Sequence, residues 1–120
     1  MSAADHQTLR LLDGRYVLER LAQGVEVDDD VLAIVRGPDG GACMRRRDDG
    51  EDAWVALWTG DAAHPPDATG MCAAIVAPLA AGTVPVWVAA SYDGDLVLVP
   101  ATRVDEAVEL LRRAGHAVTG

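Results

Sequence analysis

The clearest pattern of apolar and polar positions lies in the second half of the chain. Residues 84–91 and 95–99 are Val-rich runs that favour β-structure, and Tyr92-Asp93-Gly94 separates them. Asp-Gly between two such runs favours the backbone angles of a tight turn. The pattern therefore predicts a β-hairpin.

The segment after the hairpin, residues 102–115, has the spacing of apolar residues that is typical of a helix. Thr102 can cap the first turn, acids come early and arginines late, and Gly115 is a typical stop after the last turn. The apolar positions recur at the spacing of one helix face; they are Val104, Ala107, Val108, Leu111 and Ala114. We expect a helix here and one short strand over residues 116–119.

Residues 69–81 are almost wholly apolar and predict a buried helix that begins at Asp67 or Thr69 and ends at Gly82. Pro78 lies inside it. A proline removes one main-chain hydrogen bond and costs about 3 kcal/mol in a regular helix interior, so we expect a kink or a break near residues 74–77.

Residues 53–59 read as a strand, and residues 60–68, which contain two prolines, as a loop. The order from residue 53 is then strand, helix, strand, strand, helix, strand. This is the order of an α+β, ferredoxin-like βαββαβ fold, in which two helices cover one face of an antiparallel sheet.

The first part of the chain is predicted to be rich in β-structure. Asp13-Gly14 separates residues 9–12 from 15–21, and residues 37–40 form a Gly-Pro-Asp-Gly turn between two further runs. We expect two hairpins that extend or cover the sheet. The chain divides into an N-terminal β-rich subregion, 1–52, and a ferredoxin-like unit, 53–120, within one compact molecule.

Trp54 and Trp58 are four residues apart in the proposed strand and project from one face, where we expect them to pack under the helices. Trp87 belongs to a strand near the edge of the sheet, and it can join a subunit interface.

The net charge of the chain bears on which classes of molecule the protein can bind. The chain has 19 acids and 10 bases, a net charge of -9. The basic cluster at residues 45–47 is followed at once by four acids, which cancel its field beyond about 8 Å. We expect no nucleic-acid partner. No apolar run reaches the length of a membrane span and no secretory signal is evident, so we expect a cytoplasmic protein without a membrane partner.

Residues with catalytic or metal-binding chemistry do not form a recognisable motif. Cys43 and Cys72 lack Cys-x-x-Cys spacing and are expected to be buried free thiols, and His64 precedes two prolines in a loop. His116 is expected at the surface or at a strand edge. We therefore expect no catalytic set, no metal and no cofactor, and an enzyme or accessory protein of amino-acid metabolism that uses His64 or a cysteine is the weaker alternative.

The second half also resembles a known family. Thr69-Gly70 opens a helix that contains Pro78-Leu79-Ala80, a Ser91-Tyr92-Asp93-Gly94-Asp95 hairpin follows, and Ala114-Gly115-His116 precedes the last strand. These segments resemble ACT-domain proteins, in particular the small prokaryotic branch related to the CASTOR-type amino-acid sensors. The Leu9-to-Tyr16 segment resembles the family's N-terminal part, usually a second, degenerate ACT-like unit. The loop over residues 60–68 departs from the family pattern.

This resemblance implies a regulatory protein that binds an amino acid or a related small carboxylate, pairs as a homodimer and can have a protein partner. It places ligands where the first helix and second strand of one ACT unit meet another unit. The residues expected at the ligand are Asp67, Thr69, Gly70, Met71, Ser91, Tyr92 and Asp93.

The residues themselves support such a site. A helix that begins at Thr69-Gly70 offers free N–H groups and a partial positive charge to a carboxylate, and Asp67 or Asp93 can receive an ammonium group. In the plainer alternative, Asp67 and Thr69 only cap the helix and Asp93 only makes a turn. A structural or interaction module with a vestigial pocket is therefore the second functional hypothesis.

Overall fold

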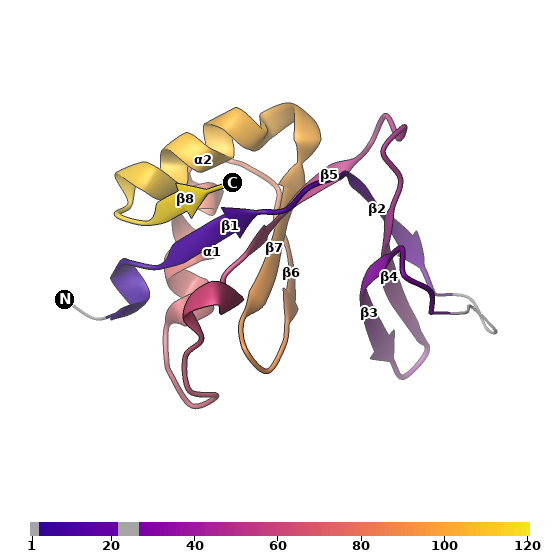
Figure 1. The fold of residues 1–120 in the computed structure, drawn as a ribbon, viewed down its shortest axis with the longest axis horizontal. Helices are drawn as coiled ribbons and strands as arrows, with labels where there is room; N and C mark the ends of the chain where they lie inside the picture. Colours follow the sequence, from indigo (N-terminus) through magenta and orange to yellow (C-terminus); the bar gives the residue numbers. More distant parts are fainter. Residues whose placement is uncertain (1–2, 22–26) are drawn as a thin grey trace.

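The computed structural model describes residues 3–21 and 27–120, and Figure 1 shows their arrangement. The fold is α+β, with a curled sheet and two helices on one side. Its strands and helices are, in chain order, β1 (Thr8–Leu11), β2 (Tyr16–Arg20), β3 (Val31–Gly37), β4 (Gly40–Arg46), β5 (Trp54–Trp58), α1 (Met71–Ala81), β6 (Trp87–Ala90), β7 (Asp95–Pro100), α2 (Val104–Arg113) and β8 (Ala117–Thr119).

The centre of the sheet is β5, which pairs antiparallel with β7, and β7 pairs antiparallel with β6. The register places Leu57 opposite Val97 and Ala90 opposite Asp95. The expected strands at 53–59 and 116–119 and the β6–β7 hairpin are thus confirmed.

The N-terminal strand β1 enters this same sheet. It pairs antiparallel with β5 and parallel with β8, so it lies between the two (Figure 1). The last strand of the ACT-like unit therefore forms its ladder with residues 8–10 instead of with β5. The division of the chain at residues 52 and 53 stays a prediction.

The hairpin expected at Asp13-Gly14 is wrong. β1 and β2 do not pair with each other, because both run antiparallel along β5, with Leu11 opposite Leu57 and Tyr16 opposite Trp54. Gly14, at φ +89°, lets the chain bend outward between the two pairings. The residues around Gly14 thus form a bend between two strands that follow the same edge of β5, and they do not form a hairpin turn.

Beyond the bend, β2, β4 and β3 form a small antiparallel sheet that projects from one side of the molecule (Figure 1). β3 and β4 are joined by a two-residue turn, with Gly37 opposite Gly40 in the register, so the hairpin expected at this position is confirmed.

Both helices pack on one face of the sheet. Alternate residues of β5 and β7 point toward them, as the period of a strand requires. The core on this face consists of Leu9, Leu57, Ile75, Leu79, Val84, Val97, Val99, Ala107 and Leu111. It includes Ala107 and Leu111 from the face expected for α2, whereas Ala114 is exposed. No side chain caps that helix, and its N-cap position is Arg103 instead of Thr102.

The tryptophans lie on the opposite face, which corrects the expectation that Trp54 and Trp58 pack under the helices. They and Trp87 belong to a second apolar cluster with Met44, supplied by the small sheet, and Leu98. The two tryptophans do project from the same face of β5, as expected. The β5 side chain that faces the helices, however, is Leu57.

Helix α1 runs from Met71 to Ala81 without interruption, so the expected break does not occur. Pro78 has no N–H for the carbonyl of Ala74, four residues earlier. The His116 side chain supplies the missing donor, because its Nε2 lies 2.9 Å from the Ala74 oxygen. His116 is 5% exposed, so of the two positions expected for it the surface position is wrong; it directly precedes β8, which ends the strand order of the sheet.

Candidate functional site

A cavity of about 350 Å³ lies at the start of α1. Three segments form it: the loop before α1, the first turn of α1 and the end of the β6–β7 hairpin. Its lining residues are His64, Pro66, Ala68, Gly70, Met71, Cys72, Ala73, Ala90, Ser91, Tyr92 and Asp95. The ligand residues predicted from the sequence come from the same three segments.

The first turn of α1 contributes backbone donors. Gly70 is the N-cap, at φ +76°, and no side chain caps this helix. Asp67 and Thr69, the expected caps, therefore do not cap it. The first intrahelical bond runs from the Ala74 N–H to the Gly70 carbonyl (3.0 Å). The N–H groups of residues 71–73 are those that a helix start leaves without an intrahelical acceptor, and they carry its partial positive charge.

Asp95 contributes a carboxylate to the same cavity. It is 8% exposed, and as the first residue of β7 it points to the helix face, like Val97 and Val99. Its backbone is held by Thr59, whose hydroxyl accepts from the Asp95 N–H at 2.8 Å. Within residues 3–21 and 27–120 its carboxylate has no hydrogen-bond or ion-pair partner. The carboxylate lines the cavity and is available to accept from a ligand cation.

Cys72 lies in the first turn of α1, close enough to Asp95 to be affected by its charge. Burial and the Asp95 charge both raise the pKa of the Cys72 thiol. A raised pKa keeps a thiol protonated at neutral pH and lowers its nucleophilicity. The second cysteine, Cys43, is buried in β4, whereas Cys72 is exposed. Both are free thiols as expected, but the burial expected for Cys72 is wrong.

His64 brings an acceptor. Its Nδ1 lies 3.1 Å from the Pro65 carbonyl oxygen, which can only accept, so the proton is on Nδ1. In the neutral ring Nε2 is then the acceptor; this atom is buried and has no hydrogen-bond partner among the described residues. Ser91 adds a hydroxyl oxygen, since its O–H donates to the Gly94 carbonyl at 2.7 Å.

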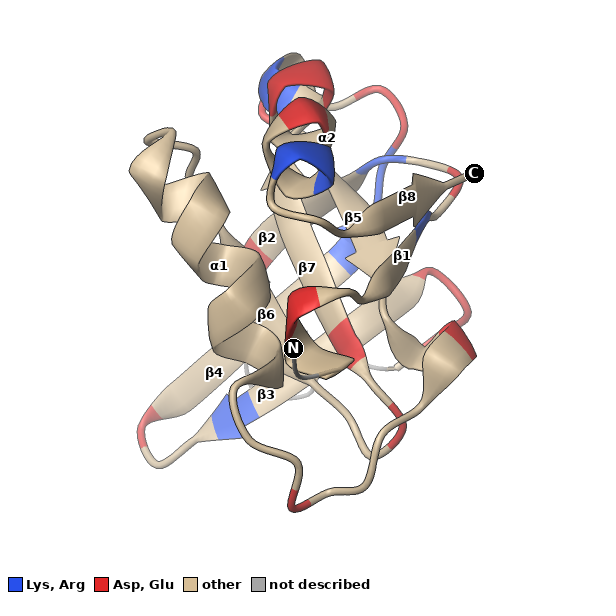
Figure 2. Cartoon of the chain, turned by 90° about the vertical axis from the view of Figure 1, so that its left-hand side faces the viewer, with Lys and Arg blue, Asp and Glu red and all other residues tan. Residues whose placement is uncertain are grey.

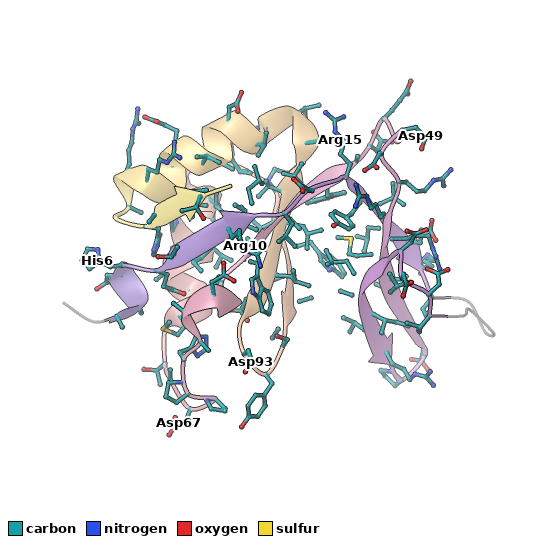
Figure 3. All side chains as sticks on the ribbon, in the orientation of Figure 1. His6, Arg10, Arg15, Asp49, Asp67 and Asp93 are labelled. Atoms are coloured by element: carbon teal, nitrogen blue, oxygen red, sulfur yellow. The ribbon has the colours of Figure 1, made fainter. Side chains whose placement is uncertain are left out.

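The residues proposed from the sequence divide into two groups. Gly70, Met71, Ser91 and Tyr92 line the cavity, whereas Asp67, Thr69 and Asp93 do not. Figure 3 shows Asp67 and Asp93 near the tips of two neighbouring loops.

Sequence reasoning missed Asp95, Cys72 and His64 as lining residues. A signal for Asp95 was present, because it opens an otherwise apolar strand and has the same parity as Val97 and Val99. Nothing in the sequence pointed to the unpartnered nitrogen of His64, which depends on how its loop folds.

A larger and more open cavity, of about 460 Å³, lies where β1 bends into β2. Its polar lining includes Arg46 and Asp48, which pair with each other at 3.2 Å. The Asp48 carboxylate also accepts from the Arg15 N–H at 2.9 Å, and this bond is the first cause of its lowered pKa. These groups are exposed and already partnered, so this cavity is the weaker candidate.

No described helix could cross a membrane, and the described residues contain no group of three or more metal-ligating side chains placed to hold a metal ion.

Comparison with known proteins shows where the fold occurs elsewhere. A family model described as ACT domain matches residues 49–113, more than half of the chain. The solved structure of Atu0741 from Agobacterium tumefaciens is 23% identical, with a TM-score of 0.77, over 94% of this chain and 92% of that one. VC0802 from Vibrio cholerae, a protein of unknown function and possible transport protein, is 18% identical, with a TM-score of 0.70 and 91% of each chain covered. A search of curated proteins found no significant match.

Proposed function

This chain belongs to the ACT domain family, and from that premise we propose that it is a regulatory protein that binds an amino acid or a related small carboxylate at the start of α1. The observation that carries the proposal is the opposite polarity of the cavity's two sides. The uncapped helix start offers N–H donors, and the unpartnered Asp95 offers a carboxylate.

The two sides suit the two charged groups of an amino acid. A ligand carboxylate at residues 71–73 accepts from the free N–H groups of the helix start. A ligand ammonium at Asp95 pairs with the unpartnered carboxylate, and its other N–H groups can donate hydrogen bonds to His64 Nε2 and Ser91 Oγ. Of the residues predicted from the sequence, Gly70, Met71, Ser91 and Tyr92 contribute to this site by lining it.

Self-association is part of the proposal. The sequence of α1 and β6, residues 71–90, contains no charged residue, although the chain has a net charge of -9. Figure 2 shows α1 free of acidic and basic residues, in contrast to α2. β6 pairs only with β7 among the described strands, and Trp87 lies at this edge. An uncharged edge strand beside an uncharged helix favours a second copy as partner.

We also propose that the chain belongs to a particular branch of the ACT domain family. The motifs from Thr69-Gly70 to Ala114-Gly115-His116 support the CASTOR-type branch. The small sheet of β2, β3 and β4 supports the interpretation of residues 1–52 as a reduced companion unit.

The alternative of an enzyme that uses Cys72 and His64 has one observation against it. Burial and Asp95 raise the pKa of the Cys72 thiol, the opposite of what an activated nucleophile requires. The alternative of a vestigial pocket predicts that no small molecule stabilises the protein, and the following experiment separates it from the proposal.

The test is thermal unfolding of the whole protein against the twenty common amino acids and their des-amino carboxylates. A ligand at about 100 times its Kd adds about 2.7 kcal/mol. At about 4 °C per kcal/mol for a chain of this size, this raises the Tm by about 10 °C. A flat response across the panel contradicts the proposal.

Two matched variants locate the site. Asp95→Asn should abolish the response to an amino acid while leaving the free protein folded, because the amide keeps the shape of the carboxylate. Asp93→Asn changes an acid two residues away, in the same turn but outside the cavity lining, and should keep the response. The reverse result would move the ammonium site to Asp93, one of the two acids that the sequence alone suggested.

A further inference from the structure

Two buried polar side chains, Gln7 and His116, join the N-terminal segment to the back of α1. The Gln7 side-chain amide donates to the carbonyl oxygens of Ala4 and Met71, both at 2.8 Å. Its backbone N–H donates to His116 Nδ1 at 3.1 Å. His116 Nε2–H in turn donates to the Ala74 oxygen at 2.9 Å. Gln7 and His116 are 7% and 5% exposed.

The two acceptors on α1 lie in its first turn, which forms a wall of the cavity. Met71 lines the cavity, and Ala74 is the first residue whose N–H bonds within the helix. The Ala74 oxygen is available because Pro78 has no N–H to offer it. Pro78 thus creates the acceptor through which His116 holds the helix.

This support differs from an ordinary helix cap. A capping side chain accepts from the first N–H groups and so uses up the donors of the helix start. Here no side chain caps α1, and the first turn is held through its carbonyl oxygens instead. The N–H groups of residues 71–73 stay available, while the turn is protected from fraying.

We infer that Gln7 and His116 are positioning residues of the α1 cavity: they hold the first turn of the helix from behind and leave its N–H groups free for a ligand. Their importance for ligand binding rests on the proposed function, whereas their hold on the turn does not.

Amide hydrogen exchange of the whole protein, measured residue by residue by NMR, tests the inference without a ligand. The variant Gln7→Met keeps the length of the side chain and removes both of its donors. We expect the Ala74 and Ile75 amides to exchange about five- to thirty-fold faster than in the unaltered protein, the factor that corresponds to about 1–2 kcal/mol.

The amides of Val97 and Leu98 in β7 serve as the reference for global unfolding, since both residues are fully buried in the central sheet. A merely structural contribution of Gln7 accelerates all these amides by the same factor. A positioning role accelerates Ala74 and Ile75 alone. Exchange of Ala74 and Ile75 at the original rate, or acceleration only in parallel with β7, overturns the inference.

Two further variants complete the design. His116→Gln, which keeps a donor and an acceptor, should accelerate the same two amides less than His116→Leu. Arg113→Met is the matched control, because the exposed Arg113 side chain donates to Glu109 within α2 at 3.0 Å; it should leave both amides unchanged. Acceleration of Ala74 and Ile75 in Gln7→Met with a flat amino-acid panel would support the inference and contradict the proposed function.

Discussion

The contact between His116 and the proline-containing helix leads to a quantitative prediction. The substitution His116→Leu removes both ring hydrogen bonds, which leaves the Ala74 carbonyl and the Gln7 N–H buried without partners. Each buried unsatisfied group costs about 1–3 kcal/mol. We therefore expect His116→Leu to lower the free energy of unfolding by about 2–6 kcal/mol.

The cause of this loss can be isolated with a second substitution. Pro78→Ala restores an N–H at position 78, four residues after Ala74, so the helix itself can satisfy the Ala74 carbonyl. In that background His116→Leu leaves only the Gln7 N–H without a partner. Its cost should fall by about 1–3 kcal/mol, which corresponds to about 4–12 °C in Tm at about 4 °C per kcal/mol.

Urea unfolding of the four proteins in this double-mutant cycle, followed by far-UV circular dichroism, measures the coupling directly. Arg113→Met serves as control, since it removes an exposed ion pair with Glu109 and should change stability by less than about 1 kcal/mol. A coupling below about 0.5 kcal/mol, the usual error of additivity, would refute the reasoning that His116 replaces the N–H that Pro78 lacks.

Three other predictions follow from the structure. Asp95→Asn should lower the pKa of the Cys72 thiol and speed its alkylation at pH 8, measured by mass spectrometry, because the Asp95 charge now raises that pKa; an unchanged rate would contradict this. The pKa values of Asp28 and Asp48 are lowered by their hydrogen bonds, so their contribution is present above about pH 4 and lost as the pH falls. An Asp28→Asn/Asp48→Asn protein should show a flatter acid titration of stability, and an equal slope would argue against it. Gly94→Ala should lower the free energy of unfolding by about 1–3 kcal/mol, measured by urea unfolding, because its Cβ meets backbone atoms of the loop after β5 at 2.5 Å.

Two Asp-Gly pairs show how far local sequence determines a turn. Asp93-Gly94 closes the β6–β7 hairpin, as predicted. Asp13-Gly14 has the same turn chemistry but separates two strands that both pair with β5. The difference comes from the partner: the edge of β5 is long enough for β1 and β2 in succession, and no local pattern reveals this.

The candidate site was predictable to a similar extent. The helix start at Gly70 and the hairpin residues Ser91 and Tyr92 come from local signals, and the structure brings them to one cavity. Asp95 could have been predicted from the alternation of side chains along β7, because it lies on the same face as Val97 and Val99. The unpartnered His64 nitrogen depends on the conformation of a loop rich in proline.

The sequence by itself determined which segments become helices and strands, since apolar period and turn chemistry act over a few residues. It also marked Pro78 as a disturbance of α1. Only the tertiary structure decided the outcome, because the group that satisfies the Ala74 carbonyl lies 42 residues away. The position of β1 between β5 and β8 also depends on the tertiary structure, because the edge of a strand can pair with any segment that reaches it in register. Hydrogen bonds between distant residues follow from the fold, and they set the position of the helix start on which the proposed site depends.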